Sequence, residues 1–500
     1  MGPRAPGIHA SSCFTSWRRG LAALLCALPA FALAGCTLGP DYARPPVVSP
    51  EGWRDAAAAD PNTLANTPWW ELLSDPQLQE MIRAALIANK DLAIATERIA
   101  ETRARLGFVK ADLWPAIDIE GKAGVIDPSG EITDLTGGDA DKVDFYALAG
   151  TVSWEIDIFG RIRRATEAQR ALLLAAEETH RAVVISLVAE VARVYVELRD
   201  ADRRLEIARR TLESRAEYVK MAKLRFEGGV TSEVDWRQAE AELHRTESFV
   251  QQFELVARQK ENEMSVLLGR NPGAITRGTP VQETIIPPHI PSGLPSSLLD
   301  RRPDILAAEQ QLVASNANIG EAKALLFPRI ALTGDYGVQS LDSGTLFTGG
   351  AKSFSLIGGL IQPIFNAGKN RRRVEVTESV MRQTLYGYEK TILNAFREVE
   401  DALIGYGKLG EQRASQGSRV EAERKVLQLA EVRYRGGVTD YLEVLDAQRS
   451  LFSAELDEVQ AITGQLVSLI RLYKALGGGW PSVGAAPADA VTVQQPIPGS

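Results

Sequence analysis

Apolar residues recur at every third or fourth position in two segments of similar length, Thr231 to Gly269 and Thr439 to Gly477. The spacing holds for about five heptads, which is typical of a left-handed antiparallel coiled coil. The first seam comprises Trp236, Ala239, Leu243, Thr246, Val250, Phe253, Ala257, Lys260, Met264 and Leu267. The second comprises Tyr441, Leu445, Gln448, Phe452, Glu455, Val459, Ile462, Leu466, Leu469, Tyr473 and Leu476.

A much longer helix is predicted ahead of each coiled-coil segment. Arg161 to Phe226 comprises 66 residues without Gly or Pro. As a straight α-helix it would be about 100 Å long, whereas helices of globular proteins average ~11–12 residues. Lys369 to Tyr434 is equally long and free of Pro, but its glycines predict bending or local irregularity. These glycines are Gly387, Gly405, Gly407, Gly410 and Gly417.

The same short motif joins each long helix to its return segment. Arg-Phe-Glu-Gly-Gly-Val-Thr at 225–231 returns as Arg-Tyr-Arg-Gly-Gly-Val-Thr at 433–439, an offset of 208 positions. Glycine permits the positive φ that ends a helix, and Thr231 or Thr439 is expected to cap the helix that follows. The chain is therefore predicted to be an internal duplication of a helical hairpin.

Strict alternation of apolar and polar residues predicts four strands. Ile117 to Val125 and Tyr146 to Ile156 form the first hairpin, with a polar loop at 127–144 between them. Ile330 to Val338 and Phe354 to Ile364 form the second. A helix precedes each hairpin, Pro76 to Leu113 and Asp304 to Leu326, and ends at Trp114-Pro115 or Phe327-Pro328, because proline stops a helix.

The fold class is therefore mainly α with a four-stranded β contribution. Four strands are too few to close a membrane pore, since small barrels need about eight. Open sheet edges are also very costly in lipid, so several copies must pool their strands. Two other interpretations stay open: the strands could be a corner of a soluble sandwich, and the helices a solid bundle without a lumen.

The N-terminus is a targeting segment. Arg18 and Arg19 precede an apolar run that is too short to span a bilayer. It ends in Leu-Ala-Gly-Cys at 33–36, the pattern of a bacterial lipoprotein signal, so Cys36 is expected to carry a lipid; a plain secretory signal is the alternative. Domains are predicted at 1–35 (signal peptide), 36–68 (lipidated linker), 69–269 (first repeat), 270–303 (linker), 304–477 (second repeat) and 478–500 (disordered tail).

Composition narrows the function further. Without the leader, 53 Lys+Arg stand against 64 Asp+Glu, which argues against a nucleic-acid-binding protein. Cys36 is the one cysteine of the mature chain, so neither an intrachain disulfide nor a thiolate metal site is expected. His180, His244 and His289 are scattered, and no nucleophile or phosphate-loop motif is present. No enzyme activity, metal or cofactor is predicted apart from the covalent lipid.

Four stretches of the chain together match the motifs of a known family. They are Cys-Thr-Leu-Gly-Pro-Asp-Tyr at 36–42, Trp69-Trp70 with Asp75-Pro76, Arg-Arg-Pro-Asp-Ile at 301–305, and Tyr-Arg-Gly-Gly-Val-Thr at 434–439 followed by Leu442 to Gln448. In these stretches the chain resembles the TolC-like outer-membrane factor family, in its lipoprotein (NodT-type) branch. The resemblance covers essentially the whole mature chain. It implies a homotrimer, a shared 12-stranded transmembrane β-barrel continuous with a trimeric α-barrel, a periplasmic adaptor and an inner-membrane RND-type transporter.

A gate is expected just past the second turn. Leu442 and Asp446 are four residues apart and so share one helix face. The resemblance implies that three copies form an apolar and an acidic ring that constrict the closed tunnel. Glu443 adds a second acid, and Tyr434 and Arg449 could bond across helices; the plain alternative is a solvated helix surface. The first repeat has Val234 and Gln238 at the positions of Leu442 and Asp446.

Two further sites are predicted. The resemblance implies adaptor docking at Arg225, Gly229, Arg433 and Gly437. A basic cluster is predicted to contact phosphate headgroups. Cations are unfavourable at a helix N-terminus because they oppose its dipole, so these residues are expected to have another role. The alternative is that they are ordinary solvated surface. The cluster comprises Arg161, Arg163, Arg164, Lys369, Arg371, Arg372 and Arg373.

These observations favour a passive outer-membrane exit duct of a tripartite efflux pump. The energy is expected to come from the inner-membrane partner, because no nucleotide or proton-relay motif is present. Two alternatives stay open: the duct of a type I protein-secretion system, and a lipid-anchored periplasmic coiled-coil scaffold. The cargo cannot be read from the sequence.

Overall fold

The computed structural model describes residues 37–54, 75–126, 143–283, 293 and 295–478. The predicted signal peptide, Cys36, Trp69-Trp70, the strand-connecting loop at 127–142 and the tail from 479 lie outside the described residues. The helices are α3 (Pro76–Ala88), α4 (Lys90–Ala111), α6 (Arg161–Glu227), α7 (Glu233–Leu267), α8 (Leu298–Arg301), α9 (Pro303–Ala324), α10 (Lys369–Arg435) and α11 (Tyr441–Ala475). Short 3-10 turns are η2 (Val281–Glu283), η3 (Pro295–Ser297), η4 (Ser343–Thr345) and η5 (Gly349–Ala351).

The chain divides into two compact units, and each takes residues from both sequence repeats. The strand unit comprises the described residues of Met1–Pro45, Ala100–Ala175 and Glu309–Gly387. The hairpin unit comprises those of Pro46–Ile99, Ala176–Ala308 and Tyr388–Ser500. None of the helices in the described part of the chain is both long and apolar enough to cross a membrane.

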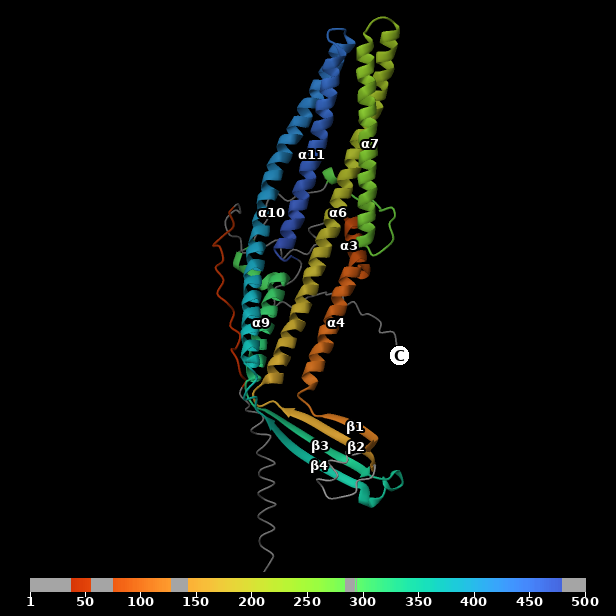
Figure 1. The fold of residues 1–500 in the computed structure, drawn as a ribbon. Coiled ribbons are helices and arrows are strands. Elements are labelled where there is room, and N and C mark those ends of the chain that lie inside the picture. Colours follow the sequence, from red (N-terminus) through yellow and green to blue (C-terminus); the bar gives the residue numbers. More distant parts are fainter. Residues whose placement is uncertain (1–36, 55–74, 127–142, 284–292, 294, 479–500) are drawn as a thin grey trace, which may run out of the picture. The chain divides into compact units, whose positions relative to one another are not determined.

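The strand unit contains one antiparallel sheet in the order β1-β2-β3-β4. The strands are β1 (Ala116–Ile126), β2 (Val143–Ile156), β3 (Arg329–Ser340) and β4 (Lys352–Ile361), as predicted from the alternation (Figure 1). Ile117 pairs with Val152, Trp154 with Leu332, and Tyr336 with Phe354. Each sequence repeat therefore contributes one hairpin of strands, and the two hairpins form a single continuous sheet.

In the hairpin unit, the turns that join α6 to α7 and α10 to α11 lie at the same end (Figure 1). All eleven residues predicted for the second seam are buried, from Tyr441 to Leu476. α10 continues through its five glycines. At Gly405 a β-carbon would lie 2.9 Å from the Ser468 hydroxyl oxygen, and at Gly410 it would lie 2.8 Å from an amide nitrogen of Gln465. These glycines therefore allow α11 to approach α10 closely.

The prediction of a single helix from Pro76 to Leu113 is wrong. The structure has two helices here, α3 and α4, divided at Asn89. Asn89 has an extended backbone (φ −63°, ψ 133°), and its side-chain oxygen accepts from the amide of Leu92 at 3.1 Å, so it begins a new helix. Its side-chain nitrogen donates to the carbonyl of Leu267 at 3.0 Å. This contact is tertiary and could not be read from helix periodicity.

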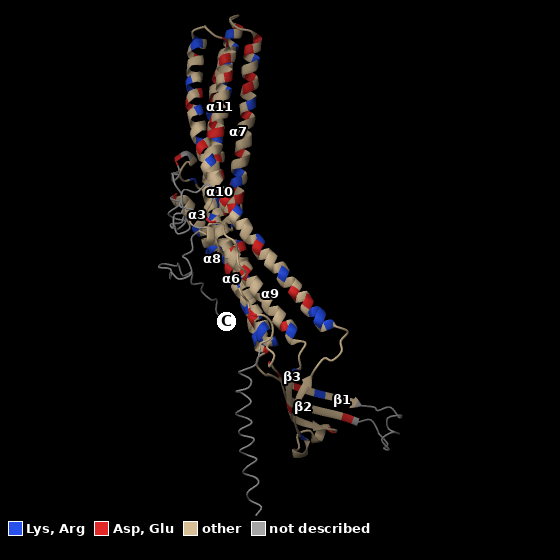
Figure 2. Cartoon of the chain, turned by 90° about the vertical axis from the view of Figure 1, so that its left-hand side faces the viewer, with Lys and Arg blue, Asp and Glu red and all other residues tan. Residues whose placement is uncertain are grey.

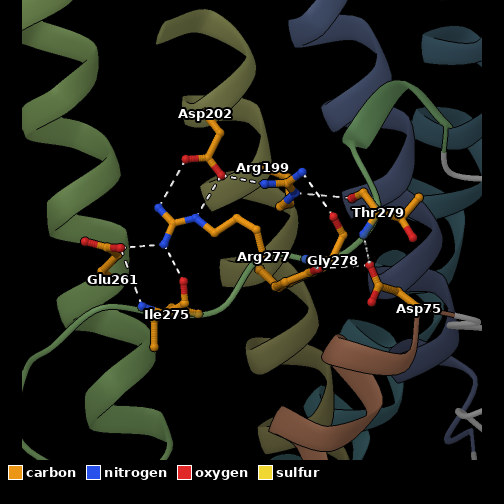
Figure 3. Close-up of polar contacts among 9 residues, drawn as sticks. Asp75, Arg199, Asp202, Glu261, Ile275, Arg277, Gly278 and Thr279 are labelled. Atoms are coloured by element: carbon orange, nitrogen blue, oxygen red, sulfur yellow. Dashed lines mark hydrogen bonds and ion pairs between the residues drawn. The ribbon is translucent and has the colours of Figure 1, made fainter. Parts of the chain in front are cut away.

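Polar contacts bind the linker after α7 to the hairpin unit (Figure 3). Asp75 caps α3 and also accepts from the Tyr195 hydroxyl at 2.9 Å and from the Thr279 amide at 2.7 Å. Arg277 pairs with Asp202 at 3.1 Å and with Glu261 at 2.5 Å. The described part of this proline-containing linker is therefore fixed by buried and half-buried hydrogen bonds.

Candidate functional site

The two hairpin turns have the same backbone structure. In the first tip (residues 225–232), the Val230 amide donates to the Arg225 carbonyl at 2.8 Å and the Gly229 amide to Phe226 at 2.9 Å. In the second tip (residues 433–440), Val438 and Gly437 make the equivalent bonds at 2.9 and 3.1 Å. This is the Schellman pattern, in which a residue with positive φ closes the helix. Gly229 and Gly437 both have φ 71°, so the role predicted for glycine is confirmed.

The predicted threonine caps are wrong. The residue at the N-cap of α7 is Ser232, whose hydroxyl accepts from the Val234 amide at 3.1 Å. The N-cap of α11 is Asp440, which makes no side-chain cap bond. Each helix begins two residues beyond the threonine, so the cap position falls one residue later, and the Thr439 hydroxyl instead donates to Glu443.

A buried ion-pair network joins the two hairpins below the tips. Arg449 on α11 lies 2.5 Å from a carboxylate oxygen of Glu242 on α7. The other oxygen of Glu242 lies 2.9 Å from Arg215 on α6. Arg215 also donates to the Glu242 carbonyl at 3.0 Å and to the Thr246 hydroxyl at 2.5 Å. The side chains of Arg215 and Glu242 are only 3% and 6% exposed, so Glu242 is a nearly dry carboxylate shared by two arginines.

The electrostatics of this network favour the ionised form of Glu242. Burial alone would raise the pKa of Glu242, but the hydrogen bond from Arg449 and the charges of Arg215 and Arg449 outweigh it and lower that pKa. Burial lowers the pKa of Arg215. The hairpins are therefore linked by charges that persist at neutral pH.

An aromatic cluster continues the link towards the tips. The Tyr434 and Tyr218 rings lie 5.7 and 5.9 Å from that of Tyr441 between centroids. The Arg225 guanidinium lies 4.7 Å from the Tyr434 ring centre, a cation–π contact between hairpins. The Tyr218 hydroxyl donates to Glu431 at 2.7 Å, and burial with this bond raises the pKa of Tyr218. Tyr218 could not be predicted from the sequence, because helix periodicity gives no sign that α6 packs against α10.

The predicted gate residues divide into two groups. Leu442 is 52% exposed, and the Asp446 side chain is 67% exposed. Tyr434 is buried in the aromatic cluster, and Arg449 is the link to Glu242, although its second nitrogen also lies 3.7 Å from Asp446. Glu443 accepts from Thr439 and lies 3.6 Å from Arg433. The structure thus leaves four of these side chains exposed on α11, whereas Tyr434 on α10 is buried; the four are Leu442, Glu443, Asp446 and Arg449.

The predicted docking residues differ in their surroundings. A β-carbon on Gly229 or Gly437 would meet open space, and Arg433 is exposed, whereas Arg225 stacks on Tyr434. Exposed apolar side chains also lie beside the predicted docking residues, and these were not predicted. These side chains are more than 60% exposed and occupy equivalent positions in both hairpins; they are Leu224, Val230, Val432 and Val438.

The basic cluster lies in the strand unit, and its members have different partners. Arg161 makes two bonds to Glu155, at 2.9 and 3.1 Å, and Arg163 binds Asp157. Arg164 is buried. The remaining residues are exposed; they are Lys369, Arg371, Arg372 and Arg373.

Basic and acidic residues both occur along the helices of the hairpins (Figure 2). Among the described residues, no group of three or more His, Cys, Asp or Glu side chains is placed to hold a metal ion.

Comparison with known proteins identifies this architecture. The model of the outer membrane efflux protein family matches residues 81–270 and 294–478. The chain is 35% identical to the toluene efflux pump outer membrane protein TtgC of Pseudomonas putida, over 91% of this chain and 95% of the relative. It is 34% identical to the cation efflux system protein CusC of Escherichia coli, over 90% and 97% of the two chains.

A solved structure supports the same assignment. The open state of the MtrE outer membrane channel of Neisseria gonorrhoeae superposes with a TM-score of 0.79 at 30% identity, covering 89% of this chain and 98% of that one. The chain belongs to the outer membrane efflux protein family.

Proposed function

We propose that this chain forms the outer-membrane exit duct of a tripartite efflux pump and conducts substrates passively. The observation that carries the proposal is the duplicated helical hairpin, whose two copies end in the same turn and are joined by Arg449 and Glu242. Relatives across nearly the whole chain are outer-membrane components of efflux systems, which supports the same role. The outer membrane is the location that follows.

The duct requires more than one copy of the chain. β1 and β4 each have one partner within the described sheet, which leaves an edge of unpaired backbone groups on both sides. Because unpaired backbone groups are very costly in lipid, neighbouring copies must cover these edges. Three copies would give a 12-stranded transmembrane barrel, and their helices would continue it as a periplasmic tube.

The hairpin tips would form the gate of this tube. Three copies of Leu442 and Asp446 would surround the axis as an apolar ring and an acidic ring. The pair Arg449–Glu242 would act as a latch, because it ties the hairpin that carries the rings to its neighbour in the same copy. Opening then requires the two hairpins to separate, and the bonds of Glu242 oppose this.

The partners follow from exposed surface and targeting. An adaptor would dock at the tips, where Arg433, Gly229 and Gly437 are accessible beside exposed valines, with Arg225 at the edge of the contact. It would couple the duct to an inner-membrane RND-type transporter. A lipid on Cys36 would anchor the chain, and the exposed members of the basic cluster would meet phosphate headgroups.

The cargo is selected elsewhere in the pump. Relatives with nearly the same identity to this chain are named for toluene and for cations. Efflux systems named for chemically unrelated cargoes therefore have similar ducts. This supports a wide, passive tube whose cargo is selected by the inner-membrane transporter.

Deletion of the gene combined with single-channel recording tests the proposal. Loss of the chain should increase sensitivity to the compounds that its partner transporter exports, and the purified oligomer should form discrete ion channels in planar bilayers. A strain carrying the same expression vector without the gene controls for expression stress. Unchanged sensitivity together with a purified protein that never conducts would exclude a duct.

A further inference from the structure

The first described residues of the chain are bound along the strand unit. The amide of Leu38 donates to the carbonyl of Phe159 at 3.3 Å, and the side chain of Asn316 donates to the carbonyl of Pro40 at 2.9 Å. A few residues on, Arg44 pairs with Glu309 at 3.0 Å. The segment 37–44, which we call the N-terminal strap, is therefore held along its length by α9 and by the connection from β2 to α6.

Arg164 on α6 is the central contact of this strap. Its guanidinium donates to the Leu38 carbonyl at 3.0 Å and to the Asp41 carboxylate at 2.7 Å. It also pairs with Glu167 at 2.8 Å, and its side chain is only 5% exposed, whereas that of Asp41 is 90% exposed. A buried arginine needs such partners, and most of the partners of Arg164 belong to the strap rather than to a lipid headgroup.

Three glycines lie where the strap contacts α9 and the connection from β2 to α6, and none of them has room for a β-carbon. Gly39 has φ 94°, and a β-carbon there would lie 2.4 Å from the Gly320 α-carbon. A β-carbon on Gly320 would lie 2.5 Å from the Leu38 carbonyl oxygen. At Gly160, between β2 and α6, a β-carbon would lie 2.9 Å from the α-carbon of Thr37. These close approaches fix the strap as tightly as its hydrogen bonds do.

We infer that Arg164 is a positioning residue for the lipid anchor, an inference that rests on the proposed lipidation of Cys36. Thr37 is held against Gly160, between β2 and α6, and is one residue along the chain, or ~3.8 Å between α-carbons, from the predicted attachment point. The acyl chains then enter the bilayer beside the strands of the same copy. A short tether raises the effective concentration of the strands at the membrane, and a longer one lowers it steeply.

Without Arg164, the first firm contact of the strap would be that of the Pro40 carbonyl with Asn316. The tether would lengthen from one residue to about four, and the effective concentration falls roughly as the −3/2 power of length. Insertion of the strands should therefore slow by up to about eightfold. A purely structural role for Arg164 would instead slow insertion whether or not a lipid is present.

A double-mutant cycle between Arg164 and the lipid separates a positioning role of Arg164 from a purely structural one. Arg164→Met is made in the lipidated chain and in a chain with Cys36→Ser behind a cleavable secretory signal. The measurement is the fraction of pulse-labelled chain that has assembled into a heat-modifiable oligomer in the outer membrane, followed over time. Arg164→Met should slow assembly in the lipidated chain and have no further effect in the chain without lipid. Arg170→Met, at an exposed position of the same helix, is the matched control.

A milder variant keeps the test informative if Arg164→Met misfolds. Asp41→Asn removes the negative charge of one partner of Arg164, and the Asp41 side chain is exposed. This variant should give a smaller delay in assembly that depends on the lipid in the same way. Equal slowing in both backgrounds, or none in either, would overturn the inference. If the two parent chains assemble at the same rate, the lipid premise fails, and the exit-duct function, which this readout does not use, is untouched.

Discussion

Arg449 on α11 and Glu242 on α7 form a short ionic contact between the two hairpins near the proposed gate, with nitrogen and oxygen 2.5 Å apart. The two partners are unequal. The Arg449 side chain is 42% exposed, whereas Glu242 is nearly dry and also carries Arg215. Loss of either residue breaks the latch, but the two losses leave very different residues behind.

Replacing Arg449 by Ala should loosen the tip moderately. The exposed partner contributes about 1 kcal/mol, and Glu242 keeps Arg215, so the open population should rise about fivefold for each latch broken. Glu242→Gln removes the same bond between the hairpins, so it should raise the open population by a similar factor. It should also destabilise the folded chain, because it leaves Arg215 buried without a counter-charge, a change that costs about 3–5 kcal/mol when a buried pair is broken. Open probability in planar bilayers measures the first effect, and the unfolding temperature of the oligomer measures the second.

Arg245→Ala is the matched control for this comparison. Arg245 lies 3.6 Å from the same carboxylate but belongs to α7, the helix of Glu242, so it does not join the hairpins. Its loss should leave the open probability nearly unchanged. An Arg245 variant that opens the channel as readily as the Arg449 variant would show that net charge, rather than the inter-hairpin bond, keeps the tip closed.

The latch should also set how the closed state responds to acid. The folded-state pKa of Glu242 is lowered, so its contribution is complete above the unfolded value of about 4.3 and is lost only as the pH falls through the folded value. Conductance should therefore stay low from pH 8 to about 5 and rise below about 4. Glu242→Gln should remove this acid response. An opening midpoint near pH 6 in the unmodified channel would assign the response to another group.

Asp446 should govern ion preference more than Glu443 does. Both lie near the start of α11, but Asp446 is 67% exposed, whereas Glu443 accepts from Thr439 and faces Arg433. Asp446→Asn should reduce cation preference, read as a shift of the reversal potential in a salt gradient. Glu443→Gln, which removes one charge of the same sign nearby, should shift it less. Equal shifts for the two variants would argue against a ring formed by Asp446.

The sequence predicted the parts of the fold that depend on local periodicity. The seam residues from Tyr441 to Leu476 and the four strands were found because apolar spacing determines which side of an element is buried. The break at Asn89 was missed, because its partner Leu267 is 178 residues away. The gate residues, including Arg449, stay a prediction from family resemblance. Glu242, the partner of Arg449, could not be predicted, since only the packing of α7 against α11 brings the two together.

Gln448 on α11 should be a site where stability can be gained. It lies on the buried seam, 6% exposed, and within the described structure neither its amide nitrogen nor its amide oxygen has a hydrogen-bond partner. An unpaired buried polar group costs about 1–3 kcal/mol, so Gln448→Leu, of similar size, should raise the temperature at which the oligomer unfolds in detergent. Gln460→Leu, at an exposed position of the same helix, should change it little. A lower unfolding temperature for the Gln448 variant would mean that the amide is satisfied by bound water that the substitution displaces.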